Sequence, residues 1–273
     1  MKRTIFFLSL MYTQAVHAQT LKEAIAMTDN EQYEVAGDLF KSLLQKEPAN
    51  GTNWFYYGEN YFKSDNLDSA AIAYSKGLQA EPANPINLVG TGKIKLEKGL
   101  NSEARADFDK ALTMSGSKTS LVQSEVAESF IRTRSKDLSY AIKLLNNAIA
   151  VDSKNPELYI LLGDAYSEQN NGTLAAENYN RALDLDKKAV KAIVQKGVLY
   201  KRSTNFEGAA AEFQSAIKMN PEFAPSYREL AETYFKMRKL DEAKQSYRKY
   251  LELSKNNTMA RMRYASFLFM SGD

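Results

Sequence analysis

The 33 carboxylates of this 273-residue chain are its most abundant groups for acid–base chemistry. Two close pairs, Asp65 with Asp68 and Asp184 with Asp186, could suggest glycoside hydrolysis, which needs two carboxyls facing each other across a cleft. Both pairs occur in turns or on outer faces of the expected helices. We therefore interpret them as solvated charges at helix ends and assign no catalytic residue.

Other catalytic and metal-binding groups are nearly missing from the sequence. The chain has no Cys, which excludes disulfides, thiol nucleophiles and thiolate metal sites. Its single His is His17, within a segment that we expect to be removed. The inventory favours a protein that is not an enzyme and that has neither a cofactor nor a metal.

The N-terminus reads MKRTIFFLSLMYTQAVHAQT. Two basic residues, a short apolar run and small residues before Gln19 are typical of a secretory signal peptide, here residues 1–18. The run is shorter than the roughly 20 residues that cross a bilayer, so we expect no transmembrane segment in the mature chain. The pattern predicts an exported protein, periplasmic or secreted.

The charge of the expected mature chain is nearly balanced. Removal of Lys2 and Arg3 leaves 34 basic residues against 33 acidic ones. Such a chain lacks the basic excess that nucleic acids or anionic membranes attract. We therefore expect no nucleic-acid partner.

An internal repeat organises the chain from position 19 to position 273. Within a unit, aromatic and small residues recur at positions 4, 7, 8 and 11 and again at 20, 24 and 27, as in WFYYGENY at 54–61 and YILLGDAY at 159–166. Steps of three and four place each set on one face of a helix, so each unit predicts a helix hairpin. The approximate units are 19–50, 51–84, 85–118, a longer unit 119–155, 156–189, 190–223, 224–257 and a partial unit 258–273.

Glycines occupy position 8 in four of the units. We interpret them as packing residues, because two helices approach closely only where no bulky side chain separates them, and the aromatic residues then fill the remaining volume. The four are Gly58, Gly92, Gly163 and Gly197.

The pattern resembles the tetratricopeptide repeat, whose signature is W-x2-L-G-x2-Y, then A-x3-F, then P. The resemblance implies an all-α fold, a right-handed superhelical solenoid of antiparallel helix hairpins. The departures are the longer unit 119–155 and Gly116, Ser153, Lys187 and Lys255, which stand where the family has Pro.

The resemblance also implies a function, namely an exported scaffold that binds a peptide or partner protein in its concave groove. In the family, first-helix positions 2, 5, 6, 9, 12 and 13 face this groove. Carried over to this chain, they nominate Phe55, Tyr56, Glu59, Phe62, Val89, Lys93, Leu96, Ile160, Asp164, Val194, Val198, Lys201, Arg228, Glu232 and Phe235. No complete unit has the Lys at position 5 with Asn at 9 by which chaperone-binding members grip a terminal carboxylate.

Position 5 is apolar in four of five regular units: Phe55, Val89, Ile160 and Val194. A recurrent apolar position predicts a stripe that meets a ligand through desolvation, or padding between adjacent first helices. Two further hypotheses stay open. The repeats could be the docking region of a longer chain with a catalytic or cell-wall-binding domain after Asp273, and the last helix could support self-association.

Overall fold

The computed structural model describes residues 20–116 and 119–272, so the expected signal peptide lies outside the described residues. These residues form helices joined by short turns and contain no strand, which confirms the predicted all-α solenoid. Residues 20–29 are helical. They are followed by α2 (Tyr33–Lys46), α3 (Gly51–Lys63), α4 (Leu67–Ala80), α5 (Ile86–Glu97), α6 (Asn101–Ser115), α7 (Ser120–Arg132), α8 (Leu138–Val151), α9 (Pro156–Glu168), α10 (Gly172–Leu185), α11 (Val190–Arg202), α12 (Phe206–Met219), α13 (Ala224–Lys236), α14 (Leu240–Ser254) and α15 (Thr258–Ser271).

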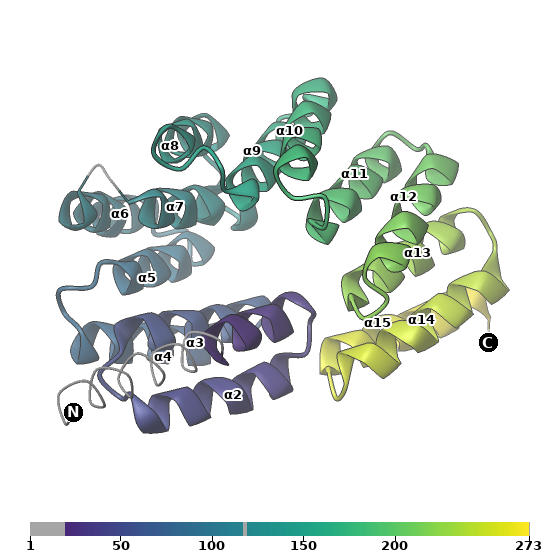
Figure 1. Ribbon diagram of the computed structural model, residues 1–273. Coiled ribbons are helices and arrows are strands. Elements are labelled where there is room, and N and C mark those ends of the chain that lie inside the picture. Colours follow the sequence, from purple (N-terminus) through teal and green to yellow (C-terminus); the bar gives the residue numbers. More distant parts are fainter. Residues whose placement is uncertain (1–19, 117–118, 273) are drawn as a thin grey trace, which may run out of the picture.

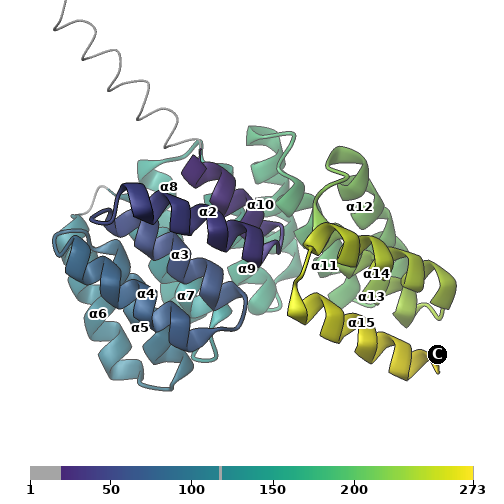
Figure 2. The same ribbon diagram turned by 90° about the horizontal axis from the view of Figure 1, so that it is seen from below.

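The helices pair into consecutive hairpins, from α3 with α4 to α13 with α14. The first helices of the hairpins also contact one another in succession, α3 with α5, α5 with α7 and onward to α13. They form an inner layer, and the chain curves so that its two ends face each other (Figure 1). Seen from below, the early helices α2–α6 and the late helices α11–α15 occupy opposite sides (Figure 2).

Local signals at the helix ends explain where the hairpins turn. Asn side chains cap the N-termini of α3, α4, α9, α10, α12 and α15 by accepting a backbone N–H, as Asn171 does from Leu174 at 3.1 Å. The turn inside most hairpins contains one residue with positive φ. These turn residues are Glu31, Asp65 and Gly99 in the first half of the chain and Asn170, Thr204 and Arg238 in the second half. Within each half they follow one another at the repeat spacing.

The hairpin of α7 and α8 departs from this rule. Its turn covers positions 133–137 and is longer than the turns of the neighbouring hairpins, and Thr133 at the end of α7 is extended. The longer turn lies in the stretch of the unit 119–155 where the sequence places its extra residues.

Four of the hairpin cores are each built on one glycine and one ring. The Tyr74 ring on α4 lies where a Cβ at Gly58 on α3 would be, only 2.3 Å from the ideal position. Gly92 has the same relation to Phe108, Gly163 to Tyr179 and Gly197 to Phe213, each at 2.4 Å. All four rings are buried. The structure thus confirms that these are packing glycines.

The last helix, α15, is covered on one side only. Phe267 is buried against Tyr247 and Phe235, with ring centroids 4.9 and 5.6 Å away. On the other side, Met262 is 65 % exposed and Phe269 is 87 % exposed. Self-association through this face stays a prediction.

The packing of Gly163 predicts that even one methyl group destabilises the protein. In Gly163→Ala, the new Cβ must push the Tyr179 ring out of its position, and overpacking of this kind costs about 1–3 kcal/mol. The better helix propensity of alanine offsets up to about 1 kcal/mol of this loss in the free energy of unfolding. The net effect is a lower melting temperature. Thermal unfolding followed by circular dichroism measures it.

Gly172→Ala is the matched control. Gly172 lies in the first turn of α10, and a Cβ there would be 3.8 Å from the Leu199 side chain, which is ordinary contact. This variant should be unchanged or slightly more stable. Equal destabilisation of the two variants would contradict the packing explanation.

Candidate functional site

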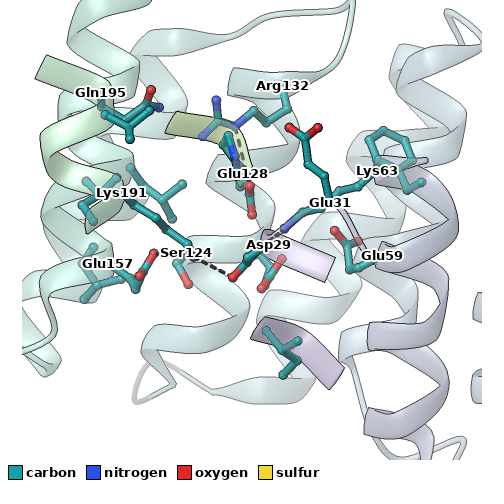
Figure 3. A pocket seen from close by; sticks show the side chains of 18 of the residues that line it. Asp29, Glu31, Glu59, Lys63, Ser124, Glu128, Arg132, Glu157, Lys191 and Gln195 are labelled. Carbon is teal, nitrogen blue, oxygen red and sulfur yellow. Dashed lines mark hydrogen bonds and ion pairs between the residues drawn. The ribbon is translucent and has the colours of Figure 1, made fainter. Parts of the chain in front are cut away.

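A cavity of about 920 Å³ lies between the inner-layer helices, and Figure 3 shows residues that line it from close by. Its wall is formed by the inner-layer helices α3, α5, α7, α9, α11 and α13, together with residues 25–31 and the turns before α9 and α13. The volume falls within the range that holds small molecules or several protein side chains. The inner layer thus lines a binding-sized space that is open to solvent on part of its surface, and the residues of its wall determine what could enter it.

The cavity wall is charged rather than apolar. Its acidic residues are Asp29, Glu31, Glu59, Glu125, Glu128, Glu157 and Glu229, and its basic residues are Lys63, Lys93, Arg132, Lys191 and Arg228. Seven acids face five bases, so at full ionisation the wall has an excess of negative charge. Aromatic and apolar groups such as Tyr56, Phe62 and Leu161 lie among them.

The most deeply buried ion pair joins α3 to α5. Lys93 Nζ donates to both oxygens of the Glu59 carboxylate at 2.7 and 2.8 Å, and the Tyr74 hydroxyl donates to the same carboxylate at 2.7 Å. Burial alone would lower the pKa of Lys93, but Glu59 and neighbouring carboxylates outweigh it and raise the pKa. Burial, then Glu59, raises the pKa of Tyr74. Both groups stay protonated, which preserves the three donated bonds.

A second polar cluster is centred on Asp164 of α9, behind the wall. Its carboxylate accepts from the Tyr179 hydroxyl at 2.8 Å and from the Gln195 amide at 2.7 Å, and it pairs with Arg132 of α7. The cluster therefore connects α7, α9, α10 and α11. Burial raises the pKa of Asp164 above its ordinary value, although Arg132 acts in the opposite direction.

Asp29 links the two sides of the cavity. Its two carboxylate oxygens pair with Lys63 of α3 at 2.9 Å and with Lys191 of α11 at 2.7 Å (Figure 3). Burial favours the neutral acid, but the two lysines prevail and lower the pKa of Asp29 to about 2. The carboxylate is therefore ionised throughout the physiological range and acts as a bridge between distant repeats.

Glu125 of α7 is the least well compensated group of the wall. Its Oε2 is buried without a hydrogen-bond partner, and burial and the neighbouring Glu128 raise its pKa to about 8. Glu128 has the opposite environment, because Lys93, Lys63 and Arg132 outweigh its burial and lower its pKa. Two carboxyls one helical turn apart therefore differ in charge near neutral pH.

We predict that Glu125→Gln stabilises the protein at pH 8. The folded state holds the Glu125 proton up to about pH 8, whereas the unfolded chain releases it near the ordinary value of 4.5. The stability contributed by this carboxyl is complete below pH 4.5 and is lost as the pH rises through 8. Glutamine does not titrate, so the gain over wild type should grow from pH 5 to pH 8 in urea unfolding experiments.

Glu128→Gln is the control, one turn along the same helix. Because the folded state favours the charged form of Glu128, its neutralisation should destabilise the protein at pH 8. If Glu125→Gln showed the pH dependence of wild type, the assignment of the proton to Glu125 would be wrong.

Eight of the fifteen groove candidates line the cavity: Tyr56, Glu59, Phe62, Lys93, Ile160, Val194, Val198 and Arg228. Three candidates, Phe55, Val89 and Leu96, are buried in the core between helices. Asp164, Lys201 and Glu232 are engaged in the polar networks behind or beside the wall, and Phe235 packs on Phe267.

The apolar stripe at position 5 is therefore divided by the structure. Phe55 and Val89 pad the packing between helices, whereas Ile160 and Val194 reach the cavity wall while remaining largely buried. The apolar stripe alone would predict an apolar cavity wall, whereas the wall is largely charged.

Sequence reasoning missed several wall residues. Glu125, Glu128 and Arg132 lie on α7, in the longer unit 119–155, where the extra residues obscure the register of the first helix. Asp29 and Glu31 belong to the first hairpin. Its first helix is short, so the repeat positions of its residues could not be assigned from the sequence. The repeat signature does not mark Asp29 or Glu31, so their charge was the one available signal.

Among residues 20–116 and 119–272, the structure shows no group of three or more metal-binding side chains. No helix in this part of the chain is long and apolar enough to cross a membrane.

Comparison with protein families identifies the repeat. Residues 21–85, 134–190 and 202–262, together more than half of the chain, match models described as tetratricopeptide repeat. Two solved structures share the fold. A tetratricopeptide repeat protein from Parabacteroides merdae aligns with a TM-score of 0.59 at 14 % identity, over 92 % of this chain and 98 % of the other. A chain of the APC/C hetero-tetramer Cut9–Hcn1 aligns with a TM-score of 0.54 at 16 % identity, over 90 % of this chain and 48 % of the other.

Three curated relatives each match a smaller share of this chain than the two solved structures do. Heat shock protein STI1 of Saccharomyces cerevisiae is 28 % identical over 37 % of this chain and 18 % of its own length. Anaphase-promoting complex subunit 3 of Schizosaccharomyces pombe is 24 % identical over 60 % of this chain and 24 % of its own length. BBSome complex member BBS4 of Bos taurus is 21 % identical over 89 % of this chain and 46 % of its own length. The chain thus spans less than half the length of each of these relatives.

Proposed function

Because the chain belongs to the tetratricopeptide-repeat family, we propose that it is a protein-interaction scaffold whose central cavity holds a segment of a partner protein. The observation that carries this proposal is the cavity itself, about 920 Å³ lined by first helices from six successive hairpins. Relatives that are named as subunits of complexes support a binding role. The fold alone does not define a function, so the nature of the wall matters more.

The wall favours a basic or polar segment. Acidic groups outnumber basic ones, and most bases are already paired, as Lys93 is with Glu59 and Lys191 with Asp29. An arriving lysine or arginine would offset the remaining negative charge. Exposed apolar area, above all Leu121, would contact the stem of such a side chain.

We assign binding and no chemical step to this cavity. Residues 19–273 contain neither Cys nor His, which removes the commonest nucleophile–base combinations. The carboxylates of the wall are mostly held in ion pairs that stabilise the fold. We also propose that the protein acts outside the cytoplasm, which the pattern of basic, apolar and small residues in the segment 1–18 supports.

Replacement of Leu121 tests the cavity as the binding surface. Leu121 is 44 % exposed and lines the cavity, so Leu121→Ser should leave the melting temperature nearly unchanged. Loss of its contact should reduce capture of the native partner by about tenfold, equivalent to about 1.4 kcal/mol. Bound proteins from an extract of the exported fraction are quantified by mass spectrometry at low and moderate salt.

Leu100→Ser is the matched control, because Leu100 is 43 % exposed and lies outside the cavity wall. It should capture the same partner as wild type. A proposal based on the cavity fails if the two variants capture partners equally well.

A further inference from the structure

The turn after the first helix reaches across to the last three helices. The backbone N–H of Ala224, at the start of α13, donates to Asn30 Oδ1 at 2.6 Å. The side chain of Asn257, the N-cap of α15, donates to the backbone carbonyl of Glu31 at 2.9 Å. These contacts join residues about 190 to 230 positions apart. We call residues 29–32 the N-terminal turn.

The Glu31 carboxylate occupies a site formed by α13, α14 and α15. Arg228 Nε of α13 donates to it at 3.2 Å, the Tyr250 hydroxyl of α14 donates to it, and Arg263 Nη1 of α15 lies 3.6 Å away. Glu31 is only 9 % exposed, and Tyr250 is fully buried. Three helices thus supply donors or positive charge to one carboxylate, the combination that holds a charged group out of water.

The shape of the turn does not explain this burial. Glu31 has φ +57°, the same left-handed conformation as Asp65, Asn170, Thr204 and Arg238 at the equivalent place in other hairpins. Those four residues are exposed to solvent. The difference at Glu31 is therefore the site on α13–α15 that receives it.

The N-terminal turn is also part of the cavity wall. Asp29 and Glu31 line the cavity together with Ile25, and Asp29 pairs with Lys191 of α11. With the turn docked, the first and last hairpins close the wall on this side. Without it, the wall would have an opening between the two ends of the solenoid.

We propose that the N-terminal turn is an internal ligand of a carboxylate-binding site on α13–α15, and that its docking closes the solenoid into a ring around the cavity. Release of the turn separates the two ends and admits molecules to the interior. The inference concerns the ring itself, so it holds whether or not the cavity binds a partner protein.

Spin labels measure the ring directly, since the chain has no Cys of its own. Labels are placed on Gln45→Cys in α2 and Ser266→Cys in α15, two exposed positions. In the wild-type background we expect one narrow distance distribution. Glu31→Lys places a positive charge beside Arg228 and Arg263, so the distribution should become longer and broader.

Asp65→Lys is the matched control, with the same charge reversal at the same turn position of the next hairpin, but in solvent. It should keep the narrow distribution. An unchanged distribution in Glu31→Lys overturns the proposal, and so does equal broadening in both variants.

Thiol labelling measures access to the cavity. Ser124→Cys in α7 lines the cavity, and its reaction with a maleimide should be about tenfold faster in Glu31→Lys than in the closed ring. Ala111→Cys in α6 is fully buried outside the wall and reports unfolding, so its labelling should stay slow.

Arg263→Gln, at the partly exposed edge of the carboxylate site, is a milder second variant and should accelerate Ser124→Cys labelling by about twofold to fivefold. It keeps the experiment decisive if Glu31→Lys unfolds. The inference is wrong if neither variant accelerates labelling at Ser124→Cys more than at Ala111→Cys.

Discussion

The contact between a glycine and an aromatic ring determines the geometry of four of the hairpins from which this molecule is built. Gly163 against Tyr179 and Gly197 against Phe213 place two helix backbones so close together that a Cβ at the glycine would lie only 2.4 Å from the ring. Because similar hairpins stack on one another in succession, each hairpin adds a rotation to the chain. Repetition of this rotation gives the solenoid its curvature, and the curvature brings the N-terminal turn to α13–α15.

The same contact also leads to the buried charges. The residue after the glycine, Glu59 or Asp164, lies beside the ring that fills the gap, and its carboxylate accepts the hydroxyl when the ring is a tyrosine. A buried carboxylate then requires a cation. The inner layer supplies one from the adjacent first helix, Lys93 for Glu59 and Arg132 for Asp164.

Ion pairs between adjacent hairpins recur at the repeat spacing. Lys63 pairs with Asp29, Lys93 with Glu59, and Arg202 with Glu168, and in each pair the two partners are separated by one full repeat. Equivalent positions of successive units are neighbours on the inner layer, so a charge at one position meets the charge of the next unit. Desolvation offsets much of the attraction in the buried pairs, which makes them determinants of register more than sources of stability.

These relations show what the sequence could predict. The repeat period predicts the helices, and the small residues predict the close contacts, because both depend on interactions within one hairpin. Pairs such as Glu59 with Lys93 were also within reach, since they connect residues one repeat apart in adjacent units. The burial of Phe55 and Val89 was harder to predict, because it depends on the angle between successive first helices, to which many side chains contribute.

The contacts of the N-terminal turn could not be predicted in this way. Asn30 and Glu31 meet Ala224 and Tyr250 only because the rotations of all intervening hairpins add up to a closed course. A small change in the rotation per hairpin, multiplied along the chain, would separate these atoms by far more than a hydrogen-bond length. Closure is thus a property of the whole array, encoded at no single repeat position.

Closure also changes how stability is distributed. In an open solenoid each repeat depends mainly on its neighbours, so the terminal hairpins fray independently. Here Asp29 and Glu31 connect the first hairpin to α11 and to α13–α15, so unfolding at either end removes contacts from the other. A chain of nearest neighbours thereby acquires a long-range coupling through the N-terminal turn, carried by Asp29, Asn30 and Glu31.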